Sequence, residues 1–159
     1  MADLNVKYGT TNQAITVTLA SLANTAFRES TAISNTTNLF LDVLVGGLIT
    51  TGTSPTVSTN IVIYTYGSVD GGTLYSGNAS GTDAAYTGPS AQLKKLGVIT
   101  VDATSDKGYE FGPFSIAQAF GGVVPADWGL VFKNQTGVAL NATGGNHDIN
   151  YQGVEGQSV

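Results

Sequence analysis

The spacing of apolar residues constrains the fold of this chain more than any other feature of its sequence. Short runs of β-branched and aromatic residues are separated by clusters of Gly, Pro, Asn and Asp, and no window repeats apolar residues with the period of a helix. This pattern is typical of antiparallel strands joined by local turns, and residues 116–120 are the only helix candidate. Strands are predicted near residues 14–22, 26–33, 38–50, 57–68, 73–76, 96–103, 109–120, 129–134, 138–142 and 147–152.

Turn residues support local hairpins between these strands. Glycine stands in the reversals 69–72, 105–108 and 134–137, where a tight turn requires a positive φ. Many short strands with local turns predict a single all-β domain, an antiparallel β-sandwich or jelly-roll-like fold. The predicted organisation is an extended N-terminal arm over residues 1–13, the sandwich over residues 14–152 and a C-terminal tail over residues 153–159.

Two of the predicted strands carry apolar residues on both faces. Residues 39–45 place Leu and Val on one side and Phe40 and Leu44 on the other, and residues 61–66 repeat this two-sided pattern. Because a half-solvated antiparallel sheet should have one polar face, something must cover the second face. Either long segments of the same chain or a neighbouring subunit can do so. The irregular segment 77–92 is a candidate contact loop, because long structureless loops are usually functional or disordered.

The composition indicates a surface that contacts other proteins. Only 11% of the residues are charged, well below the share in an average soluble domain, and 42% are hydrophobic. The net charge of −5 and the scattered Lys and Arg residues argue against nucleic-acid binding.

The absence of cysteine excludes disulfides, thiolate metal sites and cysteine nucleophiles. Neither signal-peptide export nor membrane insertion is expected, because no signal-like or long apolar segment is present.

Residues that could carry catalysis are sparse. His147 is the only histidine and lies in a glycine-rich turn, where a solvated imidazole is a simpler interpretation than a catalytic base. Asp42 is the one carboxylate inside an apolar strand, and a structural partner such as a backbone N–H is favoured over a catalytic role. No metal-site spacing or phosphate-binding loop is present. We therefore predict no catalytic residue, no cofactor and no metal, and expect that the protein is not an enzyme.

Aromatic and apolar residues are the candidate contact residues. Trp128 either fills the end of the core, with its indole N–H bonded to a loop carbonyl, or anchors an interface. In the N-terminal arm, apolar residues alternate with polar ones, which suits a segment that adds to the sheet edge of a neighbouring subunit. An additional edge strand of the same domain is the alternative. The predicted interface residues are Leu4, Val6, Tyr8, Tyr64, Tyr66, Tyr86 and Trp128.

Several motifs between about residues 38 and 142 resemble small virion proteins of tailed phages. They are Leu44-Val45, GTSPT at 52–56, IVIY at 61–64, GPF at 112–114, VPADWG at 124–129 and NQTGVAL at 134–140. In particular, the chain resembles β-sandwich capsid decoration (cement) proteins of bacteriophages. The resemblance implies a sandwich or jelly-roll fold, trimeric clustering on the capsid surface and no catalytic residue.

These observations predict a non-enzymatic virion structural protein that stabilises the shell by binding the major capsid protein. It is expected to associate with itself as a homotrimer, to be made in the host cytoplasm and to bind neither nucleic acid nor membrane. The alternative is a carbohydrate- or receptor-binding β-sandwich of a phage tail or fibre, in which Tyr64, Tyr66, Tyr75, Tyr86 or Trp128 would stack on sugar rings. A glycan-processing enzyme would instead need two carboxylates about 5–9.5 Å apart in a cleft.

Overall fold

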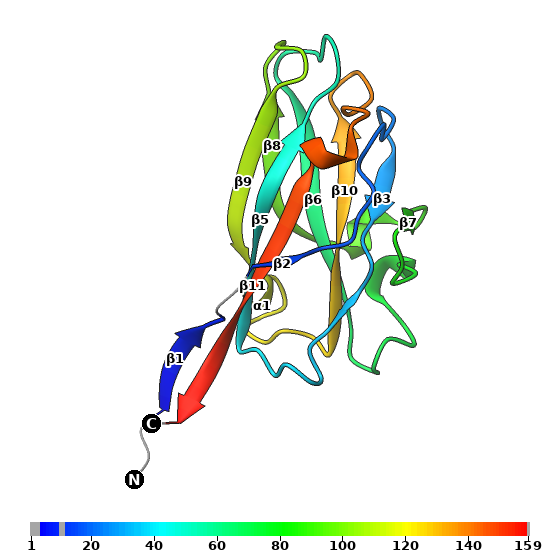
Figure 1. Cartoon of the computed structure of the whole chain (residues 1–159). Coiled ribbons are helices and arrows are strands. Elements are labelled where there is room, and N and C mark those ends of the chain that lie inside the picture. Colours follow the sequence, from blue (N-terminus) through cyan, green and yellow to red (C-terminus); the bar gives the residue numbers. More distant parts are fainter. Residues whose placement is uncertain (1–3, 10–11, 159) are drawn as a thin grey trace.

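The computed structural model describes residues 4–9 and 12–158, which form two antiparallel sheets (Figure 1). The strands are β1 (Leu4–Tyr8), β2 (Gln13–Ala14), β3 (Phe27–Glu29), β4 (Ile33–Ser34), β5 (Asp42–Thr50), β6 (Thr59–Ser68), β7 (Ala84–Ala85), β8 (Lys94–Val101), β9 (Gly108–Ser115), β10 (Asp127–Gln135) and β11 (Asp148–Ser158). The helical elements are α1 (Ile116–Ala119) and the 3-10 turns η1 (Ser76–Asn78), η2 (Ser90–Gln92) and η3 (Gly144–Asn146).

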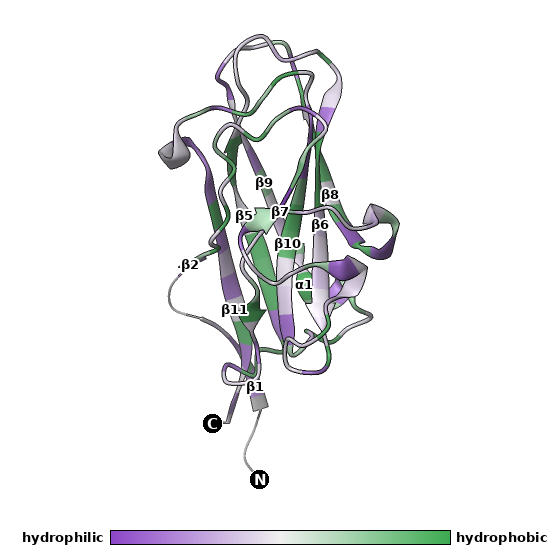
Figure 2. Cartoon of the chain, turned by 90° about the vertical axis from the view of Figure 1, so that its right-hand side faces the viewer, coloured by the Kyte–Doolittle hydropathy of each residue, from purple (hydrophilic) through white to green (hydrophobic). Residues whose placement is uncertain are grey.

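The strand order confirms the predicted all-β sandwich. The first sheet has the order β1-β11-β5-β9, and β2 also pairs with β11. The second sheet has the order β7-β3-β10-β6-β8, and β4 also pairs with β10. Hydrophobic residues recur along the strands of both sheets (Figure 2), and those that face inward form one core between the sheets. The helix predicted at 116–120 is the short α1.

Trp128 lies in this core, which was one of its two predicted roles. It is fully buried, and its ring meets the ring of Tyr151 edge to face, with centroids 5.5 Å apart and an interplanar angle of 86°. Such a pair joins β10 of one sheet to β11 of the other. The predicted bond from the indole N–H to a loop carbonyl is absent, because Nε1 is buried without a hydrogen-bond partner among the described residues.

Segment 77–92, predicted as a contact loop, covers the outer face of the second sheet. The Glu29 carboxylate accepts hydrogen bonds from the backbone N–H and the hydroxyl of Ser80, both at 2.8 Å, and β7 pairs with β3. Tyr86 of this segment packs with Tyr66 of β6 and Val131 of β10 in a second apolar cluster. The chain itself therefore supplies the cover that the two-faced pattern of β6 required.

Three predicted strands are wrong. Residues 73–76 form a loop that enters η1, and residues 138–142 make only an isolated bridge between Leu140 and Thr51. Beyond β2, residues 15–22 cross between the two sheets, although Ile15 and Leu19 are buried in the core. Alternating apolar residues indicate that one side of a segment is buried. Burial of one side does not require that the segment pairs with a neighbouring strand.

The two ends of the chain pair with each other in a ribbon that extends beyond the sandwich (Figure 1). β1 pairs antiparallel with residues 154–158, whereas β5 pairs with β11 only as far as Val154. The predicted arm is thus an edge strand of its own domain over Leu4–Tyr8, and the predicted C-terminal tail continues β11. Residues 1–3 and 10–11 of the arm, and residue 159 of the tail, lie outside the described residues.

Candidate functional site

Exposed apolar side chains gather at one end of the molecule. The loops that carry them lie at the bottom of Figure 1. Three loops lie at this end of the sandwich, namely 35–41, 69–74 and 120–126, and the ribbon projects beside them. The described residues include nine exposed large apolar side chains, and seven of these, each between 52% and 94% exposed, lie in the three loops or the ribbon. Five of the seven lie in the loops and are named the apolar end: Leu39, Leu41, Val69, Leu74 and Val123. The other two, Val6 and Tyr8, lie in the ribbon.

One backbone hydrogen bond and the pairing of three strands place the three loops of the apolar end at the same end of the second sheet. The backbone N–H of Asn35 donates to the carbonyl of Ala126 at 2.7 Å. Asp127, the first residue of β10, pairs with Ser34 of β4 on one edge and with Ser68 of β6 on the other. The three loops therefore leave the sheet from neighbouring strand ends, although they are far apart in the sequence.

The loop 35–41 is organised by a buried amide. Asn35 Oδ1 accepts from the backbone N–H of Phe40 at 2.9 Å, and Asn35 Nδ2 donates to the carbonyl of Phe40 at 3.2 Å. The Phe40 ring lies against Gly153 of β11, where a Cβ would come within 2.2 Å of the ring. Phe40 is thereby anchored to the sandwich, while its neighbours Leu39 and Leu41 remain exposed.

The loop 69–74 is organised by a carboxylate. Asp70 Oδ1 accepts from the hydroxyl of Ser68 at 2.6 Å and from the backbone N–H groups of Leu74 at 3.0 Å and Thr73 at 3.1 Å. These bonds, led by that from Ser68, lower the pKa of Asp70 below its ordinary value. Val69 and Leu74 are therefore presented on an ordered turn, which reduces the entropy lost when a partner binds.

The opposite end of the sandwich is polar. Among the described residues, its loops 51–58, 102–108 and 136–146 expose one large apolar side chain, Val57. Asp102 accepts from Lys107 Nζ at 2.5 Å, from the backbone N–H of Thr104 at 2.8 Å and from the hydroxyl of Tyr109 at 2.8 Å. These bonds, led by that from Lys107, hold the pKa of Asp102 far below its usual range. The two ends of the molecule thus differ in chemistry.

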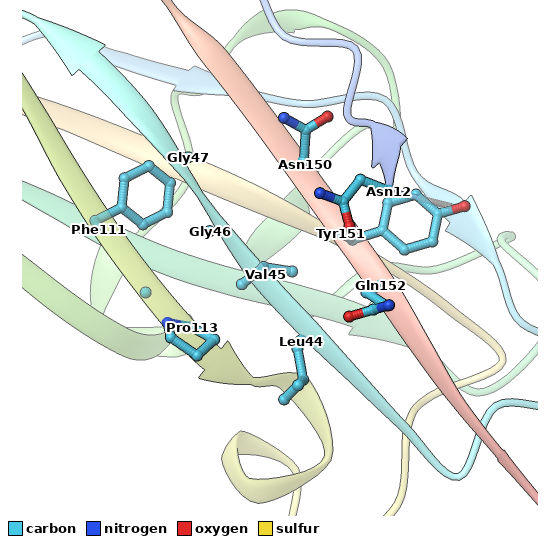
Figure 3. A pocket seen from close by; sticks show the side chains of 11 residues that line it. Asn12, Leu44, Val45, Gly46, Gly47, Phe111, Pro113, Asn150, Tyr151 and Gln152 are labelled. Atoms are coloured by element: carbon cyan, nitrogen blue, oxygen red, sulfur yellow. The ribbon is translucent and has the colours of Figure 1, made fainter. Parts of the chain in front are cut away.

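A groove of about 400 Å³ crosses the outer face of the first sheet (Figure 3). The backbone of β5 at Gly46 lies between Pro113 of β9 on one side and Asn150 and Gln152 of β11 on the other. The register of β5 against β9 shifts between Val45 and Gly47, which opens the surface here.

Two amides in the wall of the groove are held in fixed orientations. Gln152 Nε2 donates to the carbonyl of Gly9 at 2.6 Å, and Asn150 Nδ2 donates to Asp148 Oδ1 at 2.8 Å. Within the described part of the chain, their carbonyl oxygens accept no hydrogen bond and remain able to bind a donor.

The structure divides the predicted interface residues into two groups. Tyr66, Tyr86 and Trp128 are buried inside the monomer, so the prediction that they form a contact surface is wrong. Tyr66 donates to the carbonyl of Ser30 at 2.6 Å, and burial raises the pKa of its hydroxyl. Tyr64 is partly buried beside the same cluster. Val6 and Tyr8 are exposed on β1, and Leu4 lies in β1 with its side chain outside the described part of the structure.

His147 and Asp42 both have structural partners. His147 Nδ1 accepts from the backbone N–H of Thr50 at 3.4 Å, and Nε2 lies 2.9 Å from the carbonyl of Asn141. The predicted solvated imidazole is therefore a partly buried link between β5 and the loop before β11. Asp42 Oδ1 accepts from the backbone N–H of Ala117 at 2.9 Å and so fastens α1 to β5.

Over residues 4–9 and 12–158, no three His, Asp or Glu side chains form a group that could hold a metal ion. No helix in the same ranges is both long and apolar enough to cross a membrane.

The apolar end was not predicted from the sequence. Val69 before Asp70-Gly71 and Val123 after Gly121-Gly122 stand within turns, whereas Leu39 and Leu41 were predicted to belong to the strand at 38–50, which begins only at Asp42. An apolar residue inside a cluster of turn residues was the one sequence pattern that could have indicated these exposed side chains.

Comparison of the chain with protein-family models, with curated proteins and with solved structures finds no match in any of the three.

Proposed function

We propose that this protein is a non-enzymatic structural protein of a bacteriophage virion, which decorates the capsid and stabilises the shell by binding the major capsid protein through the apolar end. The observation that carries the proposal is the grouping of five exposed apolar side chains on three loops at one end of the sandwich. The resemblance of the strand and turn motifs to capsid decoration proteins supports the capsid surface as the location.

The chemistry of the apolar end favours a protein partner. Removal of apolar surface from water is favourable by roughly 25 cal/mol per Å², and ordered loops lose little entropy on binding. The low content of charged residues also limits the cost of desolvation when a large surface is buried. A rigid domain with these properties can link neighbouring capsid subunits without any chemical reaction.

The test is a double variant, Leu74→Lys with Val123→Lys, compared with Val57→Lys at the polar end. All three residues are exposed, so both variants should melt within a few degrees of the wild type. The double variant should bind at least tenfold more weakly to capsids purified without this protein, because charges replace the apolar contact. The Val57 variant should bind like the wild type. Cosedimentation with capsids measures both.

Equal capsid binding by the double variant and the wild type would contradict the proposal. So would the absence of the protein, by quantitative mass spectrometry, from purified virions of the phage that encodes it.

The groove favours a second candidate function, the binding of a saccharide by a tail or fibre protein. Its amide carbonyl oxygens on Asn150 and Gln152 suit ligands rich in hydroxyl donors, and its volume is within the usual range for small-ligand sites. Gln152→Ala should then weaken the binding of bacterial surface polysaccharide fragments at least tenfold without changing the melting temperature. Calorimetric titration that detects no binding at millimolar saccharide would remove this candidate.

A further inference from the structure

The ribbon formed by β1 and residues 154–158 has two chemically different faces. In its register, Tyr8 lies opposite Val154, Lys7 opposite Glu155 and Val6 opposite Gly156. Because side chains alternate along a strand, Val6, Tyr8 and Val154 share one face, while Lys7 and Glu155 share the other. Val6 is 68% exposed and Tyr8 is 59% exposed. The ribbon therefore has an uncovered apolar face and a polar face whose two charges cancel.

β1 also has an open backbone edge. It pairs with β11 on one side, and no other strand of the described residues pairs with it. Alternate residues of such an edge strand direct their N–H and C=O groups outward, where they can bond to another strand. A two-stranded ribbon is at best marginally stable in water, and further strands stabilise it. The edge of β1 is thus able to accept a strand.

We propose that this strand is β1 of a second copy of the chain, which pairs antiparallel across a two-fold axis at Val6. The sequence Leu4-Asn5-Val6-Lys7-Tyr8 has the same order of apolar and polar residues in both directions. In this register, residue 4 lies opposite Tyr8 of the partner subunit and Asn5 lies opposite Lys7 of the partner subunit. Apolar residues then face apolar residues and no like charges face each other, which is the self-complementarity of an isologous contact.

The resulting element is a four-stranded sheet with the order β11-β1-β1-β11. The other open edge of the ribbon, residues 155–158 with the sequence EGQS, contains residues that are depleted in strands and has no such symmetry. The contact of two five-residue strands is small, so the dimer is weak and dissociates at low protein concentration. This pairing goes beyond the proposed function and occurs in the free protein. It is two-fold, unlike the trimeric clustering implied by the resemblance.

The absence of cysteine from the chain allows a direct test by disulfide formation. In a Val6→Cys variant, two-fold pairing places the two new thiols on directly opposite residues. Opposite Cα atoms in an antiparallel pair lie about 4.5–5.5 Å apart, and a disulfide spans about 4.4–6.8 Å. A Tyr8→Cys variant is the matched control, because its residue lies on the same face and is similarly exposed but is opposite residue 4 of the partner subunit.

At equal protein concentration and under mild oxidation, the Val6→Cys variant should form covalent dimers at least tenfold faster than the Tyr8→Cys variant. Sedimentation equilibrium of the wild type should fit a monomer–dimer equilibrium. Equal rates for the two variants, a trimer, or a wild-type monomer at all concentrations up to about 1 mM would each overturn the inference. Capsid binding is measured separately with the Leu74 and Val123 variant, so either proposal can fail without the other.

Discussion

Single polar residues position the loops of this protein, which has no disulfide and few charges. Asn134 is fully buried, and its Nδ2 donates to the carbonyls of Leu22 at 2.8 Å and Val138 at 2.7 Å. Its Oδ1 accepts from the backbone N–H and the hydroxyl of Thr136, at 3.0 and 2.8 Å. One side chain thus satisfies several backbone groups of two loops that would otherwise be buried without partners.

Asp83 has a comparable role on the outer face of the second sheet. Its Oδ1 accepts from Arg28 Nε at 2.5 Å and from the backbone N–H of Thr18 at 3.0 Å, and its Oδ2 accepts from the hydroxyl of Thr18 at 2.5 Å. Burial by itself raises the pKa of Asp83, but the bonds from Arg28 and Thr18 outweigh it, and the pKa lies below its ordinary value.

The lowered pKa of Asp83 predicts how stability depends on pH. A carboxyl whose pKa is lower in the folded state stabilises the fold above its unfolded pKa of about 3.9, and this contribution is lost as the pH falls through the folded value. Asp83→Asn should lower the free energy of unfolding at pH 7 by about 1 kcal/mol, a figure that allows for solvent screening. The difference from wild type should shrink below pH 4.

Urea unfolding at pH 7 and pH 3 measures the free energy of unfolding of Asp83→Asn and of wild type. Glu110→Gln is the control, because Glu110 is exposed and its carboxylate accepts no hydrogen bond among the described residues. A difference between Asp83→Asn and wild type that is unchanged at pH 3 would show that the carboxylate charge is not responsible.

At the scale of elements, β1 and the core strands contribute differently. β1 pairs only with residues 154–158 of β11, of which β5 pairs with Val154 alone, and none of the residues of β1 belongs to the described core. Residues 15–19, which follow β2, place Ile15 and Leu19 in that core without forming a strand. The sandwich therefore depends on residue 15 onward, and the ribbon depends on the sandwich.

Deletion of residues 2–8 should accordingly leave a cooperative thermal transition and lower the melting temperature by only a few degrees, because about 1–2 kcal/mol of edge pairing is lost. Ile15→Ala, which removes core contacts, should cost about 2–4 kcal/mol. Calorimetry of both proteins tests this order. Loss of the cooperative transition on deletion would place β1 within the folding unit.

At the scale of the whole molecule, the two faces and the two ends of the sandwich have different chemistry. Segment 77–92 covers the outer face of the second sheet, whereas the outer face of the first sheet carries the groove. The loops at one end of the sandwich are polar. The opposite end consists of the loops of the apolar end, with the ribbon beside them. Because the candidate contact surfaces are segregated in this way, a molecule bound through the apolar end would hold its polar end away from the partner.

The sequence by itself determined the local features of this protein. Short runs of β-branched and aromatic residues predicted β5, β6, β8 and β10 to within a few residues, and the glycine at 137 marked the turn after β10. The two-sided pattern of residues 61–66 showed that both faces of that strand had to be covered. These features follow from side-chain alternation and backbone preference, which depend on neighbouring residues only.

Only the tertiary structure decided which distant segments meet. No local pattern indicates that segment 77–92 covers β6, that β1 pairs with the C-terminal strand, or that Asn35 bonds to Ala126 and joins the loops 35–41 and 120–126. Ile15 and Leu19 alternate like strand residues, yet they are buried by a crossing segment. Burial and exposure depend on how the whole chain packs, so the same alternation leads to irregular core structure at residues 15–19 and to an exposed ribbon in β1.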